Sequence, residues 1–342
     1  MKAKGECEEG DRLPGAPHPR ERTTLVGHAE AEAEILTAWR MGRLPHALLI
    51  GGPEGIGKAT LAYRVARFVL ANPKPGAKSL DIPADHPVTR QIAVLSHPDL
   101  LVLRRVAAEE DKKLPAEISA DEARRPVKFF GTTAAYGGYR VCIVDSLDEL
   151  NKHGANSLLK ILEEPPAHSL FLLISHSPGR LLATIRSRCQ KFFLRPLSVE
   201  QVARAVNEIT AEMDGLPHDK IFDAANASGG SVRHALALLF DDGLEVRSLT
   251  QKLLARLPDT DGEGMHKLGE SLRGNDGFFV FTETIEDWLA AEATKTSEPL
   301  ARLARLAETW ENVHRAGIET DAYGLDRKPF VFQVFAMLAK AT

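Results

Sequence analysis

The stretch LLIGGPEGIGKAT, residues 48–60, joins an apolar run to a glycine-rich loop and then to the first residues of a helical pattern. Within it, GPEGIGK at 52–58 has the spacing G-x-x-x-x-G-K, which forms a phosphate-binding loop when a strand precedes it and a helix follows. Both neighbours are predicted here, so a plain strand-to-helix turn is the less favoured interpretation. The spacing does not match the dinucleotide fingerprint G-x-G-x-x-G, which disfavours a hydride-transferring enzyme. The stretch therefore predicts a P-loop fold.

The residues of this loop suit a phosphate better than its magnesium ion. Glycines allow the turns that point N–H groups at an anion, the helix start adds partial positive charge, and Lys58 can reach the outer phosphates. Ala59, however, stands where a Ser or Thr hydroxyl usually coordinates Mg²⁺, and Thr60 lies about 100° further round the helix. The candidate nucleotide-binding residues of the loop are Gly52, Pro53, Glu54, Gly55, Ile56, Gly57, Lys58, Ala59 and Thr60.

A second departure lies in YRVCIVDSLDEL, residues 139–150. Asp145 ends an apolar run, as the magnesium-orienting aspartate of a P-loop protein does, and is a further candidate nucleotide-site residue. Ser146 follows it, where many ATPases of this type carry a glutamate that polarises the attacking water. Asp148 and Glu149 come too late to replace that glutamate without a change of register, and a solvated helix start is the favoured interpretation of both. We therefore expect little or no intrinsic ATPase activity.

Five short apolar runs alternate with helix-like stretches in the first 195 residues. They are HALLIG (46–51), DLLVLRR (99–105), YRVCIVD (139–145), LFLLISH (170–176) and CQKFFL (189–194). This alternation predicts an α/β domain with a parallel sheet and helices on both faces. The segment 71–87, which contains several Pro and Lys residues, is expected to be a loop or a small insertion.

After Pro196 the apolar spacing becomes helical, beginning with a capping box at Ser198 and Gln201. Four segments are therefore expected: a flexible tail at 1–22, a P-loop domain at 23–195, a small helical domain at 196–245 and a second helical domain at 246–342.

Composition narrows the class of protein. The chain has 342 residues, 44% hydrophobic and 26% charged, with a net charge of −4, so it has no overall basic footprint for nucleic acid. No apolar run approaches the roughly 20 residues that span a bilayer, and the N-terminus lacks the apolar centre of a secretory signal. Three widely separated cysteines support neither a disulfide framework nor a zinc site. We expect a cytoplasmic protein with no membrane contact and no bound metal of its own.

The stretch at 151–194 carries the most specific signals. Its helical pattern ends at Pro165, yet Glu163 and Glu164 lie in the last turn, where acidic charge opposes the helix dipole by about 0.3–1 kcal/mol each. This indicates a partner surface, although exposed charges tolerated at small cost are an equally good interpretation.

Four pieces of sequence together resemble the clamp-loader branch of the AAA+ proteins, over about residues 24–240. They are LVGHAEAEAEILTAW (25–39), RLPHALLIGGPEGIGK (43–58), NSLLKILEEPP (156–166) and LLATIRSRCQ (181–190). In this family, the arginine of a Ser-Arg-Cys motif reaches the γ-phosphate of a neighbouring subunit's ATP. The resemblance implies that Arg188 is such a trans-acting arginine finger, with nearby Arg186 as its rival. It also implies that Ser175 is a polar sensor near the nucleotide and that Arg233 is the second sensor, on a helical lid.

The resemblance has limits that matter for function. Hydrolysing members of the family carry Ser or Thr after the lysine and Asp-Glu on the later strand, and many bacterial members carry a four-cysteine zinc module. This chain has Ala59, Ser146 and no cysteine between Lys58 and Cys142. We therefore expect no zinc, weak binding of ATP or ADP, Mg²⁺ only together with nucleotide, and little hydrolysis.

Together with these departures, the resemblance implies a non-motor clamp-loader subunit of a DNA polymerase III holoenzyme, without a polymerase site of its own. It would support ATP-dependent loading of the sliding clamp by supplying Arg188 to an adjacent ATPase. Residues 196–245 would be the lid and 246–342 the collar that assembles the ring.

The implied partners are gamma/tau and delta types of subunit and, through the assembly, the clamp and primer-template DNA. The alternative is an active gamma/tau-like motor in which Thr60 or water replaces the missing magnesium ligand; a small-molecule P-loop kinase is a remote third hypothesis.

Overall fold

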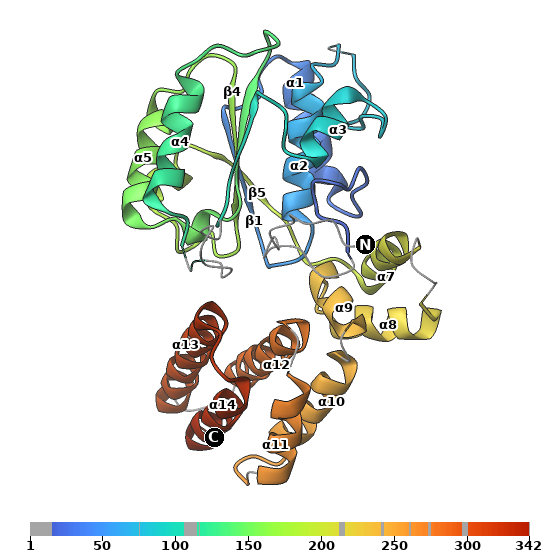
Figure 1. Cartoon of the computed structure of the whole chain (residues 1–342), viewed down its shortest axis with the longest axis vertical. Helices are drawn as coiled ribbons and strands as arrows, with labels where there is room; N and C mark the ends of the chain where they lie inside the picture. The colour runs from blue at the N-terminus through green and yellow to red at the C-terminus, as the bar shows by residue number, and fades with distance from the viewer. Residues whose placement is uncertain are drawn as a thin grey trace, which may run out of the picture. The chain divides into compact units, whose positions relative to one another are not determined.

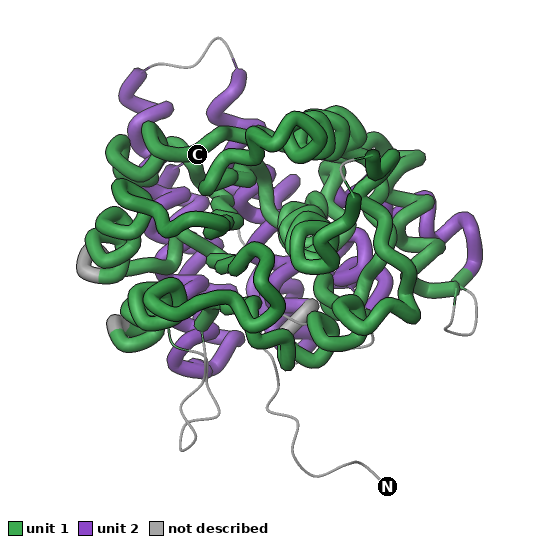
Figure 2. Tube along the Cα trace, turned by 90° about the horizontal axis from the view of Figure 1, so that it is seen from above, with its two compact units in different colours: residues 1–216, 229–233 green, residues 217–228, 234–342 purple. Residues whose placement is uncertain are grey.

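The structure is a computed structural model that describes residues 16–74, 76–105, 115, 117–211, 216–240, 243–259, 261–272, 275–295 and 300–341. Its contacts divide the chain into two compact units (Figure 2). The first comprises Met1–Leu216 with Gly229–Arg233, and the second comprises Pro217–Ser228 with His234–Thr342. The domain boundaries expected near residues 195 and 245 stay predictions.

A five-stranded parallel sheet forms the centre of the first unit (Figure 1). Its strands are β1 (Ala47–Gly51), β2 (Leu100–Leu103), β3 (Arg140–Val144), β4 (Ser169–Ser175) and β5 (Gln190–Phe193), in the order β2-β3-β4-β1-β5. The predicted parallel sheet is confirmed, and each strand overlaps one of the five apolar runs. Gly51 pairs in register with Ser175 on one side and Phe193 on the other, so the loop after β1 starts beside the carboxyl end of β4.

Helices cover both faces of the sheet, as predicted (Figure 1). On one face lie α1 (Ala29–Arg40), α2 (Lys58–Leu70) and α3 (Pro87–Ala93); on the other lie α4 (Ala120–Phe130) and α5 (Lys152–Glu163). Successive β1 side chains point to opposite faces: Leu48 and Ile50 belong to the core that includes α1 and α2, whereas Leu49 belongs to the core that includes α5. Every residue of β1 and β4 is buried, and burial on both faces explains why their sequences are nearly continuously apolar.

Part of the predicted tail is packed against the first unit. The buried guanidinium of Arg67 on α2 donates hydrogen bonds to the carbonyls of Arg20 (3.0 Å) and Arg22 (3.1 Å). Arg20 in turn donates to the carbonyl of Ala93 (2.8 Å). These hydrogen bonds hold residues 16–22 in place, because their backbone carbonyls are the acceptors for the buried guanidinium of Arg67. Residues 1–15 of the predicted tail lie outside the described residues.

The described residues after Pro196 form helices and no strand, as predicted. The helices are α7 (Val199–Thr210), α8 (His218–Ala227), α9 (Val232–Leu239), α10 (Gly243–Leu254), α11 (Gly262–Ser271), α12 (Asn275–Ala293), α13 (Leu300–Tyr323) and α14 (Arg327–Ala341). The capping box at the start of α7 is confirmed, because Ser198 Oγ accepts from the Gln201 backbone N–H and Gln201 Oε1 accepts from that of Ser198. None of the described helices is both long enough and apolar enough to cross a membrane.

Candidate functional site

The glycine-rich loop connects β1 to α2, the context that the sequence predicts. Gly52 (φ 143°), Gly55 (φ 74°) and Gly57 (φ 105°) all have positive φ, which residues with a Cβ rarely adopt. Gly57 directly precedes the first residue of α2, so the loop ends at a helix N-terminus, where free N–H groups and the helix dipole favour an anion. The backbone therefore has the features of a phosphate-binding loop.

The loop holds its own lysine in this conformation. Lys58 is only 3% exposed, and its Nζ donates to the carbonyls of Gly52 (2.7 Å) and Pro53. Burial lowers the pKa of Lys58 from 10.5 to about 8 because the charged form loses hydration. Three nearby carboxylates partly oppose this shift: Glu54, Asp145 and Asp148. A phosphate that uses Lys58 would therefore have to replace the two loop carbonyls.

The residues at the magnesium position fit a cation poorly. Ala59 presents only a methyl group, which packs at the edge of the hydrophobic core that includes α2. Asp145 follows β3 and lies close enough to Lys58 to act on its pKa. Ser146 is 2% exposed, and its hydroxyl has no hydrogen-bond partner within the part of the chain that the structure describes. The glycine loop thus fits a phosphate, whereas the site lacks the hydroxyl that would normally join Mg²⁺ to it.

Asp148 has a role that the sequence did not indicate. Its Oδ1 accepts from Ser175 Oγ (2.9 Å) and the Ser177 backbone N–H (3.2 Å), and its Oδ2 accepts from the His176 backbone N–H (2.6 Å). Asp148 is exposed at the start of the one-turn helix Leu147–Glu149 (η1), as predicted, and η1 also brings its carboxylate to the end of β4. No local sequence pattern predicts that Asp148 contacts Ser175, which lies 27 positions further along the chain.

Glu149, unlike Asp148, departs from the expected solvated position. It pairs with Arg105, whose Nε lies 3.1 Å from its Oε2. Burial raises the pKa of Glu149 to about 7, although Arg105 partly opposes the shift. The Glu149 carboxylate is therefore half-buried and forms an ion pair with Arg105. This pairing indicates a structural role for Glu149.

The start of α9 closes on the phosphate loop. The carbonyl of Gly55 accepts from the backbone N–H groups of Val232 (3.0 Å) and Arg233 (3.3 Å), and a Cβ at Gly55 would meet Ser231 Oγ at 2.2 Å. Arg233 Nε lies 3.4 Å from Glu54 Oε1. The structure therefore brings two predicted site residues, Arg233 and Glu54, together at the loop.

Two histidines near the loop were not predicted. His28, directly before α1, has Nε2 at 2.7 Å from the carbonyl oxygen of Ile56. His176 follows Ser175 at the end of β4. Its pKa is lowered, mainly because the imidazole is buried and secondly because the positive charge of Lys58 is nearby. His28 lies within one of the quoted family stretches, but only the fold shows that it contacts the loop.

Arg188 follows α6 (Ala183–Arg186) and precedes β5. Its Nη1 donates to the carbonyl of Thr184 (2.8 Å) and its Nη2 pairs with Glu163 Oε1 (2.7 Å), while a third of its side chain stays exposed. The rival Arg186 has its Nε buried without a hydrogen-bond partner among the described residues. Arg188 is thus an oriented, accessible cation, and Glu163 has a partner 25 positions further along the chain.

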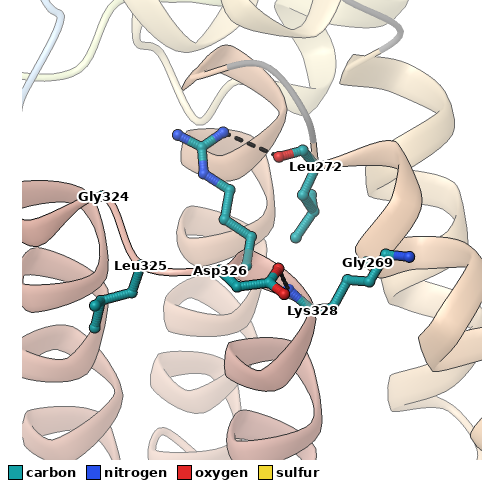
Figure 3. Close-up of a pocket in the computed structure, with 7 residues that line it drawn as sticks. Gly269, Leu272, Gly324, Leu325, Asp326 and Lys328 are labelled. Carbon is teal, nitrogen blue, oxygen red and sulfur yellow. Dashed lines mark hydrogen bonds between the residues drawn. The ribbon is translucent and has the colours of Figure 1, made fainter.

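A separate pocket lies in the second unit (Figure 3). Its volume is about 350 Å³, and the lining residues are Gly269, Leu272, Gly324, Leu325, Asp326, Arg327 and Lys328. Arg327 Nη1 donates to the carbonyl of Leu272 (2.9 Å), and Lys328 Nζ lies 3.2 Å from Glu270 Oε1. The cations at this pocket therefore already have partners within the second unit, and none of the predicted site residues lines it.

A family model described as DNA polymerase III, delta subunit matches residues 27–198. The DNA polymerase III subunit delta' of Escherichia coli is 34% identical over 230 residues, 67% of this chain and 65% of that protein. The delta' subunit of Pseudomonas aeruginosa is 39% identical over 171 residues, 49% of each chain. DNA polymerase III subunit tau of Salmonella typhimurium is 30% identical over 225 residues, 64% of this chain and 33% of tau. The matched part therefore spans between 49% and 65% of these two delta' relatives.

Solved structures that resemble this chain include a DNA polymerase III gamma subunit-related protein and a RuvB variant, both from Thermotoga maritima. The first is 18% identical with a TM-score of 0.39, covering 90% of this chain and 99% of that chain. The second is 17% identical with a TM-score of 0.45, covering 92% and 91%.

The parallel sheet, the P-loop after β1 and the helix start that closes on it define a P-loop protein of the AAA+ class. The chain belongs to the DNA polymerase III delta-subunit family defined by that model. Within it, the chain is similar to delta' subunits.

Proposed function

We propose that this subunit supplies Arg188 to the ATP site of a neighbouring ATPase subunit and thereby supports ATP-dependent loading of a sliding clamp onto DNA. The observation that carries this proposal is the oriented, partly exposed guanidinium of Arg188 in an intact Ser-Arg-Cys motif. A guanidinium stays charged and can bind phosphate oxygens through several N–H groups, so it suits the charge that develops during phosphoryl transfer.

The chain's own nucleotide site has a lesser role in this proposal. The loop and Lys58 would hold the phosphates of ATP or ADP, with Arg233 and Ser175 at its edge. Ala59 offers no magnesium ligand, and Ser146 offers no carboxylate to polarise water. Weak nucleotide binding with little hydrolysis is therefore proposed, with Mg²⁺ bound only alongside the nucleotide.

The names of the relatives, which are delta' and tau subunits, support the subunit partners that we propose. Subunits of the gamma/tau and delta types would be the direct neighbours, with contacts through the helical collar at 246–342. The sliding clamp and primer-template DNA would be reached through the assembly. The net charge of −4 agrees with DNA contact that is local or shared among subunits.

The test is Arg188→Ala in an assembly reconstituted with its ATPase subunits. Hydrolysis at the site that Arg188 serves should fall on the order of 10³-fold, because arginine fingers contribute about 10³–10⁵ in rate. Incorporation of the variant and its thermal unfolding should match those of the wild type. Arg186→Ala is the matched control and should leave the rate near normal. An unchanged rate with Arg188→Ala, or a loss only with Arg186→Ala, would contradict the proposal.

The alternative of a gamma/tau-like motor is supported by the 30% identity to two tau subunits. Steady, Mg²⁺-dependent ATP turnover by the purified chain, abolished by Lys58→Ala, would establish it. The missing hydroxyl at Ala59 leads us to expect no such turnover.

A further inference from the structure

The geometry around Arg188 points to a role for Glu163, and this inference rests on the proposed function of Arg188. We propose that Glu163 is the resting counter-ion of the arginine finger, which neutralises Arg188 until a neighbour's phosphate displaces the carboxylate. Glu163 would be a positioning residue, because it acts on the reaction only through Arg188. The carboxylate lies 2.7 Å from Arg188 Nη2.

The fold brings this carboxylate to the arginine from a distant part of the chain. Glu163 is the last residue of α5, and Leu158 and Leu162 of that helix are each 1% exposed in the core beneath the sheet. The helix end is thereby fixed beside α6 and the residues after it. An acidic side chain at a helix C-terminus is unfavourable by itself, and pairing with Arg188 offsets that repulsion.

Arg188 has two contacts with different effects: the Thr184 carbonyl orients its guanidinium, and Glu163 opposes its charge. The carbonyl of Thr184 accepts from Nη1 at 2.8 Å, which orients the guanidinium without changing its charge. Glu163, in contrast, brings a full negative charge to Nη2. A phosphate approaching the same guanidinium would be repelled by this carboxylate, and it would compete for the donors.

The exposure of the pair makes the exchange feasible. The side chains of Arg188 and Glu163 are 33% and 50% exposed. Exposed ion pairs of this kind change an equilibrium by only about 1.5- to 5-fold, so a nucleotide phosphate with greater charge can displace the carboxylate. The remaining N–H groups of Arg188 can meet the phosphate first, before the bond to Glu163 breaks.

Glu163→Gln separates the two effects, because the carboxamide keeps an oxygen acceptor at the same place and removes the charge. In the reconstituted assembly, this variant should raise kcat/KM for ATP by about 1.5- to 5-fold. Glu163→Asp, which keeps the charge but shortens the side chain by one methylene, should give a smaller rise. Glu164→Gln is the matched control, because it removes the same charge one residue further on, and it should leave kcat/KM unchanged.

The decisive measurement combines variants. Glu163→Gln in the Arg188→Ala background should behave as Arg188→Ala alone, since the carboxylate acts only through the arginine. A fall or no change with Glu163→Gln, an equal rise with Glu164→Gln, or a rise that persists without Arg188 would overturn the inference. If Arg188→Ala itself leaves hydrolysis intact, the proposed function fails; if it abolishes hydrolysis while Glu163→Gln has no effect, only the role of Glu163 fails.

Discussion

At the scale of single residues, the phosphate loop is organised around a buried lysine. Lys58 donates to two carbonyls of its own loop, and burial lowers its pKa to about 8. In this buried position, the charged ammonium of Lys58 loses hydration that it would have in water, and the two carbonyls replace it only in part. A loop in this state is ready to accept the negative charge of a phosphate, provided that the phosphate replaces the carbonyls.

The lowered pKa predicts a pH dependence of stability. In the unfolded chain, Lys58 keeps its proton up to about pH 10.5, whereas in the folded protein it releases the proton near pH 8. Between these values the unfolded state binds more protons, so folding stability should rise with pH by up to about 1.4 kcal/mol per unit. Because other lysines titrate in the same range, the quantity to measure by urea denaturation is the difference from Lys58→Met. The wild type should gain stability relative to the variant between pH 8 and 10; a difference independent of pH would contradict this.

At the scale of elements, the short helix η1 and strand β4 are joined by one side chain. Asp148 accepts three hydrogen bonds at the end of β4, where Ser175 was predicted to act as a sensor. The position of Ser175 therefore depends on the turn after β3 as well as on its own strand. The acidic helix start in the sequence predicted the exposed position of Asp148 but not its contact with β4.

Asp148→Ala should destabilise the protein by about 1–2 kcal/mol, because three donors lose a charged acceptor that water replaces only in part. Equilibrium denaturation in urea would measure this change. Asp85→Ala, at an exposed position in the loop before α3, should change stability by less than about 0.5 kcal/mol. Equal effects of the two substitutions would mean that the contact of Asp148 with β4 contributes nothing specific.

At the scale of the whole molecule, the contacts divide the chain into two compact units. The first unit packs helices on both faces of its sheet. In the second, Phe281 on α12 lies with its ring centre 5.9 Å from that of Phe330 and 6.4 Å from that of Phe335. This aromatic cluster joins α12 to α14.

Phe281→Ala should destabilise the second unit by about 3–5 kcal/mol, because the side chain is fully buried and its removal leaves a cavity. Calorimetry would show a lower unfolding temperature for the transition of that unit. Phe332→Ala removes the same side chain from a site on α14 that is 40% exposed, and it should have a smaller effect. A similar loss from both would show that the aromatic cluster is not the core of the second unit.

The sequence by itself determined the features that depend on local patterns. Apolar runs located all five strands, most clearly β1 and β4, in which every residue is buried, and the glycine spacing located the loop between β1 and α2. The missing hydroxyl at Ala59 and the Ser-Arg-Cys motif around Arg188 could also be read directly. Each of these signals is contained within a few neighbouring residues.

Only the tertiary structure decided which distant side chains meet. The contacts of Asp148 with Ser175 and of Glu163 with Arg188 cross 27 and 25 positions. They depend on strand order and on how η1, α5 and α6 turn at the edge of the sheet, and no local pattern carries that information. The same holds for Lys58, whose motif predicts a phosphate contact, whereas burial and the orientation of two loop carbonyls determine its partners and its lowered pKa.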